Sequence, residues 1–265
     1  MKRYRYSYRS AIHFTQPVAR HVFKLRCLPV GNACQTCISE SLKVAPEAGL
    51  LYDLDYFGNR IQYGLILDGH DYFEFTSSGE LALSDYFIPE FRRAHPMFAF
   101  ESKLTGVSAA LSDFAHSLGK PLAKGSKAYT IHRKAIQIAD AVHSHFKYSP
   151  GSTSNETSAA EAFEKAEGVC QDYAHVFIAV CRKLGMKARY VNGFMPGIGF
   201  THAWAEVYDG SGWIGVDPTN NNLIECGYIK IAHGRDASDC PVNRGVYTGM
   251  AGQRTEICVF TEEST

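Results

Sequence analysis

The first part of the chain, up to about residue 95, alternates apolar and polar positions with a period of two. Tyr4, Tyr6 and Tyr8 alternate with arginine and serine, which places the aromatic rings on one face of a predicted strand. Further strands are predicted at residues 21–29, 35–44, 59–67 and 71–77. Short strands at this spacing favour an antiparallel β-sandwich, and we interpret the tyrosine face as part of its core rather than as a surface that stacks on nucleic-acid bases.

Helical spacing replaces this alternation between about residues 93 and 106. Helices are predicted at residues 108–118, from Ser126 or Lys127 to 146, and at 158–166. Strands are predicted at residues 187–194, 200–208, 213–220 and 254–261. We expect the last strand to close the sheet of this second part. The sequence therefore predicts an α+β protein with one domain over residues 1–100, the β-sandwich, and a second over residues 101–265.

A buried helix with a cysteine at its start is predicted between Gly168 and Gly185, because apolar residues cover most of its circumference. Cys170 stands at the N-terminus, where the unpaired N–H groups of the first turn favour the negatively charged thiolate, the form that attacks carbon. We expect Gly168 to let a substrate backbone approach. Asp172 is interpreted as a structural carboxylate of the first turn, and Gly185 is expected to end the helix in the left-handed conformation.

A β-hairpin downstream supplies a base and a carboxylate. His202 lies on its first strand, a turn follows at residues 209–212, and Asp217 lies on the second strand immediately before a proline that ends the pairing. A nucleophile at a helix N-terminus, a base on one strand and an orienting carboxylate on the next match the logic of a catalytic triad. The predicted catalytic residues are therefore Cys170, His202 and Asp217.

Other residues are weaker candidates for contact with a substrate or with its oxyanion. Gln171 follows the cysteine, Trp204 shares a strand face with the histidine, and Tyr148 lies in a segment that leads toward the nucleophile helix. The backbone N–H of Cys170 is the expected first oxyanion donor, and the second is not readable from the sequence. The glycine-containing residues 195–199 are expected to form a mobile loop that gates access to the site.

Several blocks of the sequence resemble the transglutaminase-like superfamily, and in particular its bacterial proteins described as cysteine proteases. These blocks are residues 168–172, 201–207 and 212–220 around the predicted triad, residues 55–60 in the first part, and residues 233–236 and 241–247 near the end. The resemblance implies a Cys170, His202 and Asp217 triad on a papain-like core, preceded by the family's N-terminal region. It does not fix the substrate.

Composition narrows the choice of partners and cofactors. Lysine plus arginine and aspartate plus glutamate both number 27, so no net field attracts nucleic acid or an anionic membrane. Cys34 and Cys37 form a C-x-x-C pair without a second ligand pair, and no loop has calcium-ligand spacing, so neither a metal nor another cofactor is expected. The basic N-terminus is not followed by an apolar stretch, and eight scattered cysteines suit a reducing compartment, so we expect a cytoplasmic protein.

Three functions remain open at this point. Hydrolysis of a peptide or amide through an acyl-enzyme is the first hypothesis, because all three triad residues are present. Transfer of a glutamine acyl group to an amine is the second, and a peptide-binding module without catalysis is the third. The expected partner in each case is a peptide or protein.

Overall fold

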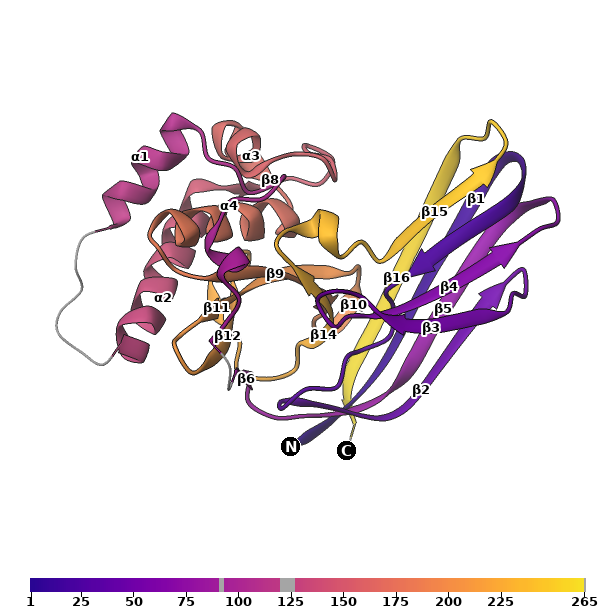
Figure 1. The fold of residues 1–265 in the computed structure, drawn as a ribbon, viewed down its shortest axis with the longest axis horizontal. Helices are drawn as coiled ribbons and strands as arrows, with labels where there is room; N and C mark the ends of the chain where they lie inside the picture. The colour runs from indigo at the N-terminus through magenta and orange to yellow at the C-terminus, as the bar shows by residue number, and fades with distance from the viewer. Residues whose placement is uncertain (91–92, 120–126, 265) are drawn as a thin grey trace.

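The computed structural model describes residues 1–90, 93–119 and 127–264 (Figure 1). Ser126, a possible helix start in the sequence, lies outside this range. The N-terminal part consists of strands β1 (Lys2–Leu25), β2 (Gln35–Ala45), β3 (Leu50–Leu54), β4 (Arg60–Ile66) and β5 (His70–Leu83). Figure 1 shows these strands as a unit that stands beside a part containing the helices.

The long strand β1 organises the N-terminal part. Its first half pairs antiparallel with β5 on one side, and its second half, from residue 21, pairs with β4. The register shifts between His13 and Val18, where the strand changes partners. Tyr4, Tyr6 and Tyr8 are all buried, so the prediction that the tyrosine face belongs to a core is confirmed.

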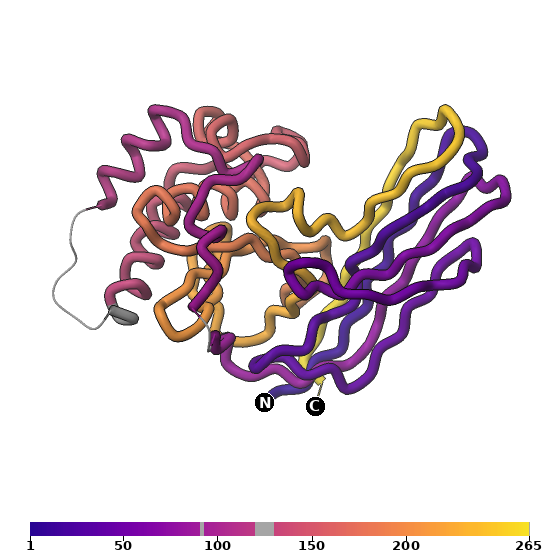
Figure 2. Tube along the Cα trace, viewed as in Figure 1, coloured from indigo at the N-terminus to yellow at the C-terminus, as the bar shows by residue number. Residues whose placement is uncertain are grey.

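The end of the chain returns to this N-terminal sheet, which corrects the prediction for the last strand. Strands β15 (Asn243–Thr248) and β16 (Gln253–Ser264) both pair with β1, along its second and first halves respectively. Figure 2 shows the C-terminal segment running beside the N-terminal one, with the two termini close together. The strand therefore does not close the sheet of the second part. Alternation of apolar and polar side chains predicts a strand and its buried face, but it does not predict which strand it pairs with.

The second part is built on an antiparallel sheet. Within the described residues its strand order is β13 (Asn222–Leu223), β12 (Gly212–Asp217), β11 (His202–Tyr208), β9 (Ala188–Phe194) and β14 (Ile229–Gly234), and β6 (Phe87–Pro89) also pairs with β12. The predicted hairpin is confirmed as β11 and β12, with Ala205 opposite Val216 and Tyr208 opposite Trp213. This sheet holds the base and the carboxylate on neighbouring strands.

Helices cover this sheet. They are α1 (Ala109–Leu118), α2 (Lys127–His145), α3 (Ala159–Lys165) and α4 (Cys170–Lys183). The helix α4 is central, because it contacts β11 and β9 as well as the other three helices. It ends as predicted at Gly185, whose φ of 76° lies in the left-handed region. None of the described helices is long and apolar enough to span a bilayer.

Two side-chain amides join the N-terminal part to the edge strand β14. Gln35 donates to the carbonyl of Lys230 and accepts from its N–H, both at 2.8 Å. Asn59 makes the same pair of bonds with the backbone of His233, also at 2.8 Å. Asp55 accepts from the backbone and side chain of Asn59, which fixes that amide in place. The amides thus satisfy backbone groups that an edge strand would otherwise leave open.

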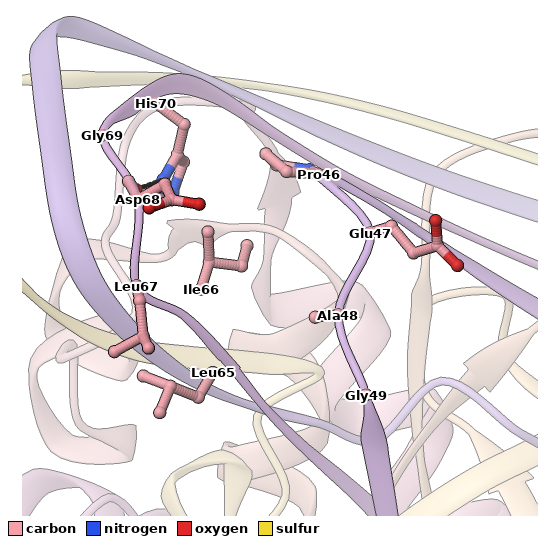
Figure 3. A pocket seen from close by; sticks show the side chains of 10 residues that line it. All are labelled: Pro46, Glu47, Ala48, Gly49, Leu65, Ile66, Leu67, Asp68, Gly69 and His70. Atoms are coloured by element: carbon pink, nitrogen blue, oxygen red, sulfur yellow. Dashed lines mark hydrogen bonds between the residues drawn. The ribbon is translucent and has the colours of Figure 1, made fainter.

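A hollow of about 340 Å³ lies in the N-terminal part, between residues 46–49 and residues 65–70 (Figure 3). His70 lines it and approaches the buried His21, with 3.2 Å between their ring nitrogens. None of the three predicted catalytic residues lines this hollow.

Candidate active site

Cys170 is the first residue of α4, as the sequence predicts. Val169 is the N-cap with extended backbone, and the Oδ2 atom of Asp172 accepts from the Val169 N–H at 2.8 Å. Thr153 donates to the same oxygen at 2.6 Å. Asp172 is therefore a capping residue, which agrees with its structural interpretation. The cap fixes the first turn and with it the direction of the half-buried Cys170 side chain.

Gly168 serves this cap rather than the approach of a substrate, which corrects the expectation from the sequence. A Cβ atom at position 168 would lie 2.6 Å from both the Cβ and the Oδ2 of Asp172. The space beside Gly168 is therefore already filled by the capping carboxylate, and the glycine is buried.

His202 and Asp217 form a buried pair on adjacent strands. The distance from His202 Nε2 to Asp217 Oδ2 is 2.7 Å. The imidazole is 8% exposed and the carboxylate is fully buried, so water does not weaken this bond. Because Asp217 occupies Nε2, Nδ1 is the ring nitrogen left for another partner.

The charges of this group perturb one another. Burial alone would lower the pKa of His202, but hydrogen bonds to Asp217 and Cys170, with the negative charges of both, raise it to about 9. Burial pushes the pKa of Asp217 upward, and the hydrogen bond and positive charge of His202 outweigh it, so that pKa is lowered. The environment thus favours a protonated imidazole beside an ionised Asp217.

Asp217 is held by more donors than the sequence reveals. Its Oδ2 also accepts from the side chain of Asn220 at 2.7 Å and from the hydroxyl of Tyr228 at 2.8 Å. Its Oδ1 accepts from the backbone N–H groups of Thr219 at 2.9 Å and Asn220 at 3.2 Å. Asn220 lies in the same sequence block as the aspartate and could have been proposed from that proximity. Tyr228 carries no local signal, because only the fold brings it to the carboxylate.

Trp204 is not a substrate contact in this structure, because it is fully buried. Its ring lies 6.4 Å from that of His202 at an interplanar angle of 26°, and its Nε1 donates to the hydroxyl of Tyr86 at 3.0 Å. Alternation along the strand correctly put Trp204 on the face of His202 but could not show that Tyr86 and Ile88 pack against it. The tryptophan ring is therefore a buried neighbour of the imidazole.

A buried charge cluster continues along the same strand face. Glu206 is fully buried and accepts from Lys230 Nζ at 2.8 Å with both oxygens, from Arg189, and from the Tyr86 hydroxyl at 2.6 Å. Burial opposes ionisation, yet Arg189 and Lys230 lower the pKa of Glu206 to about 2. Burial and the charge of Arg189 lower the pKa of Lys230 to about 8. We name Glu206, Arg189 and Lys230 the charge cluster.

Tyr148 and Gln171 both lie close to Cys170 in the fold or the sequence and are at least partly exposed. The short strands β7 (Lys147–Tyr148) and β8 (Glu167–Gly168) pair in parallel and put Tyr148 beside Gly168. Tyr148 is 54% exposed, and its pKa is raised by partial burial and by the nearby negative charge of Cys170. Gln171 is half-buried, with its Nε2 at 3.5 Å from the carbonyl of Asn155.

The predicted gating loop is a paired strand instead. Residues 197–199 form β10 (Gly197–Gly199), which pairs with β16 of the N-terminal sheet, with Ile198 opposite Phe260. Glycine content suggested mobility, but tertiary pairing overrides that local preference. The side chains of Ile198 and Phe200 are 80% and 73% exposed, just before His202. Two exposed apolar side chains thus lie in the segment that leads into β11.

Comparisons with known proteins agree with this architecture. Residues 116–218 match the model of the transglutaminase-like superfamily, and residues 4–82 match that of the bacterial transglutaminase-like N-terminal region. The uncharacterized protein Rv2569c of Mycobacterium tuberculosis is 27% identical over 97% of this chain and 91% of its own length. The uncharacterized protein ML0607 of Mycobacterium leprae is 27% identical over 93% of both chains.

A solved structure shares the whole fold. It is a protein of Cytophaga hutchinsonii described as a "putative cysteine protease", with a TM-score of 0.79, 24% identity, and coverage of 100% of this chain and 93% of that one. At this identity the likeness concerns the fold, and the two family matches together span more than half of the chain studied. The chain belongs to the transglutaminase-like superfamily, in its bacterial form with a transglutaminase-like N-terminal region.

Proposed function

We propose that this protein is a thiol-dependent acyl-transfer enzyme that hydrolyses peptide or amide bonds through a Cys170, His202 and Asp217 triad. The observation that carries the proposal is the shared imidazole. His202 is bonded to Asp217 at 2.7 Å, and Cys170 acts on the same ring as a hydrogen-bond partner and charge. Each residue occupies a different element, α4, β11 and β12, which fits the roles of nucleophile, base and orienting group.

The reaction follows from these positions. His202 takes the proton of the Cys170 thiol through Nδ1, and the thiolate sulfur attacks the carbonyl carbon of the scissile amide. The tetrahedral intermediate collapses as the C–N bond breaks, and the imidazolium gives its proton to the departing amine. Water, deprotonated by His202, then attacks the thioester and releases the carboxylic acid and the free thiol. Asp217 keeps the ring oriented and stabilises its cationic form throughout.

The backbone N–H of Cys170 is the proposed first donor to the oxyanion, since a residue at the start of a helix has no partner for its N–H within that helix. Gln171 remains a candidate for the second donor, because its amide is adjacent and half-buried.

A papain-like core preceded by an N-terminal β-sandwich is part of the proposal. So is a cytoplasmic, reducing location, which suits a chain whose eight cysteines are all free.

Exposed apolar side chains near the triad support a peptide as the substrate. Tyr148 pairs with Gly168, two residues before Cys170, while Ile198 and Phe200 shortly precede His202 in the sequence. Exposed aromatic and aliphatic residues next to a nucleophile are suited to the side chains of an extended chain. We therefore propose a flexible segment of a peptide or protein with apolar residues near the scissile bond.

Thiol labelling tests the nucleophile. Limiting iodoacetamide at mildly acidic pH should modify Cys170 before the other cysteines, and intact-mass and peptide analysis would locate the label. Burial raises the pKa of Cys34 to about 11 and that of Cys181 further, so both should stay unmodified. Cys258 on β16 is exposed and supplies a matched control. Preferential labelling of Cys34 or Cys181 would contradict the proposal.

Turnover of a peptide library tests the reaction. Cys170→Ala should abolish cleavage, whereas Cys258→Ala should leave it unchanged. Product masses in the presence and absence of an added primary amine distinguish the acceptors, because hydrolysis yields an acid and transfer yields a substituted amide. Binding of peptides without any product, by a chain with a reactive Cys170, would instead support a binding module.

A further inference from the structure

Three donors converge on one oxygen of the triad carboxylate. Asp217 Oδ2 accepts from His202 Nε2 at 2.7 Å, from Asn220 Nδ2 at 2.7 Å and from the Tyr228 hydroxyl at 2.8 Å. The tyrosine lies between β13 and β14, eleven residues beyond the aspartate in sequence. Its hydroxyl competes with the imidazole for the same negative charge.

The Tyr228 ring also contacts the base and its support. Its centroid lies 6.0 Å from that of the His202 ring and 5.4 Å from that of Trp204, with an edge-on angle of 84° to the latter. The side chain is therefore in contact with both members of the His202 and Asp217 pair. A residue placed only to fill space would not need a hydroxyl aimed at the carboxylate.

We propose that Tyr228 is a positioning residue of the triad, which fixes Asp217 Oδ2 and limits how strongly that oxygen binds the proton-carrying His202. A hydrogen bond to a carboxylate stabilises its charge, so each additional donor leaves less of that charge for the imidazole. Tyr228 thereby keeps the base from holding its proton too tightly. The catalytic meaning of this effect rests on the proposed function, whereas the effect on His202 itself does not.

The backbone around Tyr228 is held in place from the N-terminal part. Gly227 has a φ of 93°, which favours glycine, and a Cβ atom there would lie 3.1 Å from Pro196 Cγ and 3.2 Å from the hydroxyl oxygen of Tyr4. The segment is thus packed between β1 and the residues that lead into β10. Tyr4 and Pro196 thus limit the movement of the backbone at Gly227, next to Tyr228.

The groups that face this network are few. Asp217 and Cys170 act on His202 from β12 and α4, and Asn220 and Tyr228 act on Asp217. Burial and the charge of Asp217 raise the pKa of Tyr228, so its hydroxyl keeps the proton and stays a donor across the working pH range. A change in the proton affinity of His202 can therefore be traced to the variant introduced.

Titration of His202 by NMR tests the proposal without need of a substrate. In a Cys170→Ala background, which removes the thiol, the His202 pKa should be about half a unit higher in Tyr228→Phe than in the parent. Tyr208→Phe is the matched control, because Tyr208 lies on the same strand as His202 but donates to the carbonyl of Gly210 at 2.9 Å. That control should leave the His202 titration unchanged.

An unchanged or lowered His202 pKa in a folded Tyr228→Phe protein would overturn the proposal, since a merely structural tyrosine would loosen the pair and lower the value. If this variant does not fold, Gly227→Ala decides the question: its Cβ would crowd Pro196 and Tyr4, so the backbone next to Tyr228 must shift, and a weakened Tyr228 bond should also raise the His202 pKa. The test separates this inference from the proposed function. An unreactive Cys170 would contradict the proposed enzymatic function. The His202 titration would still test the role of Tyr228 independently.

Discussion

The charge cluster offers a direct test of how the sheet beneath the base is stabilised. We consider Glu206→Gln, which keeps the shape of the side chain and removes its charge. In the parent, both oxygens of Glu206 bind Lys230 at 2.8 Å, and the carboxylate also binds Arg189 and Tyr86. All of these side chains are buried, so the variant leaves two cations without an anion in a low-dielectric environment.

The expected loss is about 3–5 kcal/mol, the range for breaking a buried ion pair by removing one partner. The pKa of Glu206 leads to a similar figure. A fall from 4.5 to about 2 corresponds to about 3 kcal/mol at neutral pH, at roughly 1.4 kcal/mol per unit. For a chain of this size, such a loss lowers the melting temperature by about 10 °C.

The pH dependence of the loss identifies its cause. The depressed pKa of Glu206 gives stability that is present above about pH 4.5 and is lost as the pH falls toward 2. Lys230, with its pKa lowered to about 8, instead opposes folding while it is protonated, and this penalty fades as the pH rises from 8 to 10.5. Glu206 raises the Lys230 pKa, so its removal should lower that pKa further, and the variant should recover part of its stability as the pH rises toward 8.

Urea denaturation of parent and variant, followed by circular dichroism at several pH values, measures both effects. Glu263→Gln is the control, because Glu263 pairs with Lys2 on the surface and should not shift the midpoint measurably. A loss below about 1 kcal/mol for Glu206→Gln at pH 7, or a loss that does not change with pH, would show that the cluster is not held together by its charges.

Two further variants probe the site itself. Asp217→Asn removes the anion that helps to raise the His202 pKa to about 9. The pKa of His202 measured by NMR should therefore fall, and the alkaline limb of the activity profile should move to lower pH with it. An unchanged His202 pKa would exclude the aspartate as the charge partner. Gly168→Ala forces a Cβ atom against Asp172 and should lower the free energy of unfolding by about 1–3 kcal/mol. Gly106→Ala is the control, because the nearest atom to its Cβ would lie 3.8 Å away, and it should leave the free energy of unfolding unchanged. Equal losses in the two variants would refute the packing argument.

Local sequence placed Cys170, His202 and Asp217 on the correct elements because each residue lies in a pattern that is typical of its own helix or strand. Alternation placed His202 and Trp204 on one strand face, and the apolar helix placed Cys170 at an N-terminus. Contacts that depend on distant segments were not predictable in the same way. Tyr228 reaches Asp217 only because the chain turns between β13 and β14, and the burial of Trp204 depends on residues that precede the helical part.

Pairing with distant segments also explains two wrong predictions, the mobile loop at residues 195–199 and the sheet to which the last strand belongs. Residues 195–199 are rich in glycine, which locally suggests a loop, yet β16 pairs with residues 197–199 and makes them a strand. The strand at the end of the chain was assigned to the nearer sheet, although its partner β1 lies more than 200 residues away in sequence. Strand pairing over such separations is set by the complete fold rather than by local propensity.

The N-terminal part shares its apolar core with the part that contains the candidate site. Tyr6 and Tyr8 pack on Phe194 of β9, with ring centroids 5.8 and 5.3 Å apart, so one apolar core continues across both parts. A fragment of residues 101–265 would expose Phe194 and leave β15 and β16 without β1. We expect this fragment to give NMR spectra of an unfolded or aggregated chain, in contrast to the full protein. A well-dispersed spectrum with selective labelling of Cys170 would show instead that the second part folds and forms its site alone.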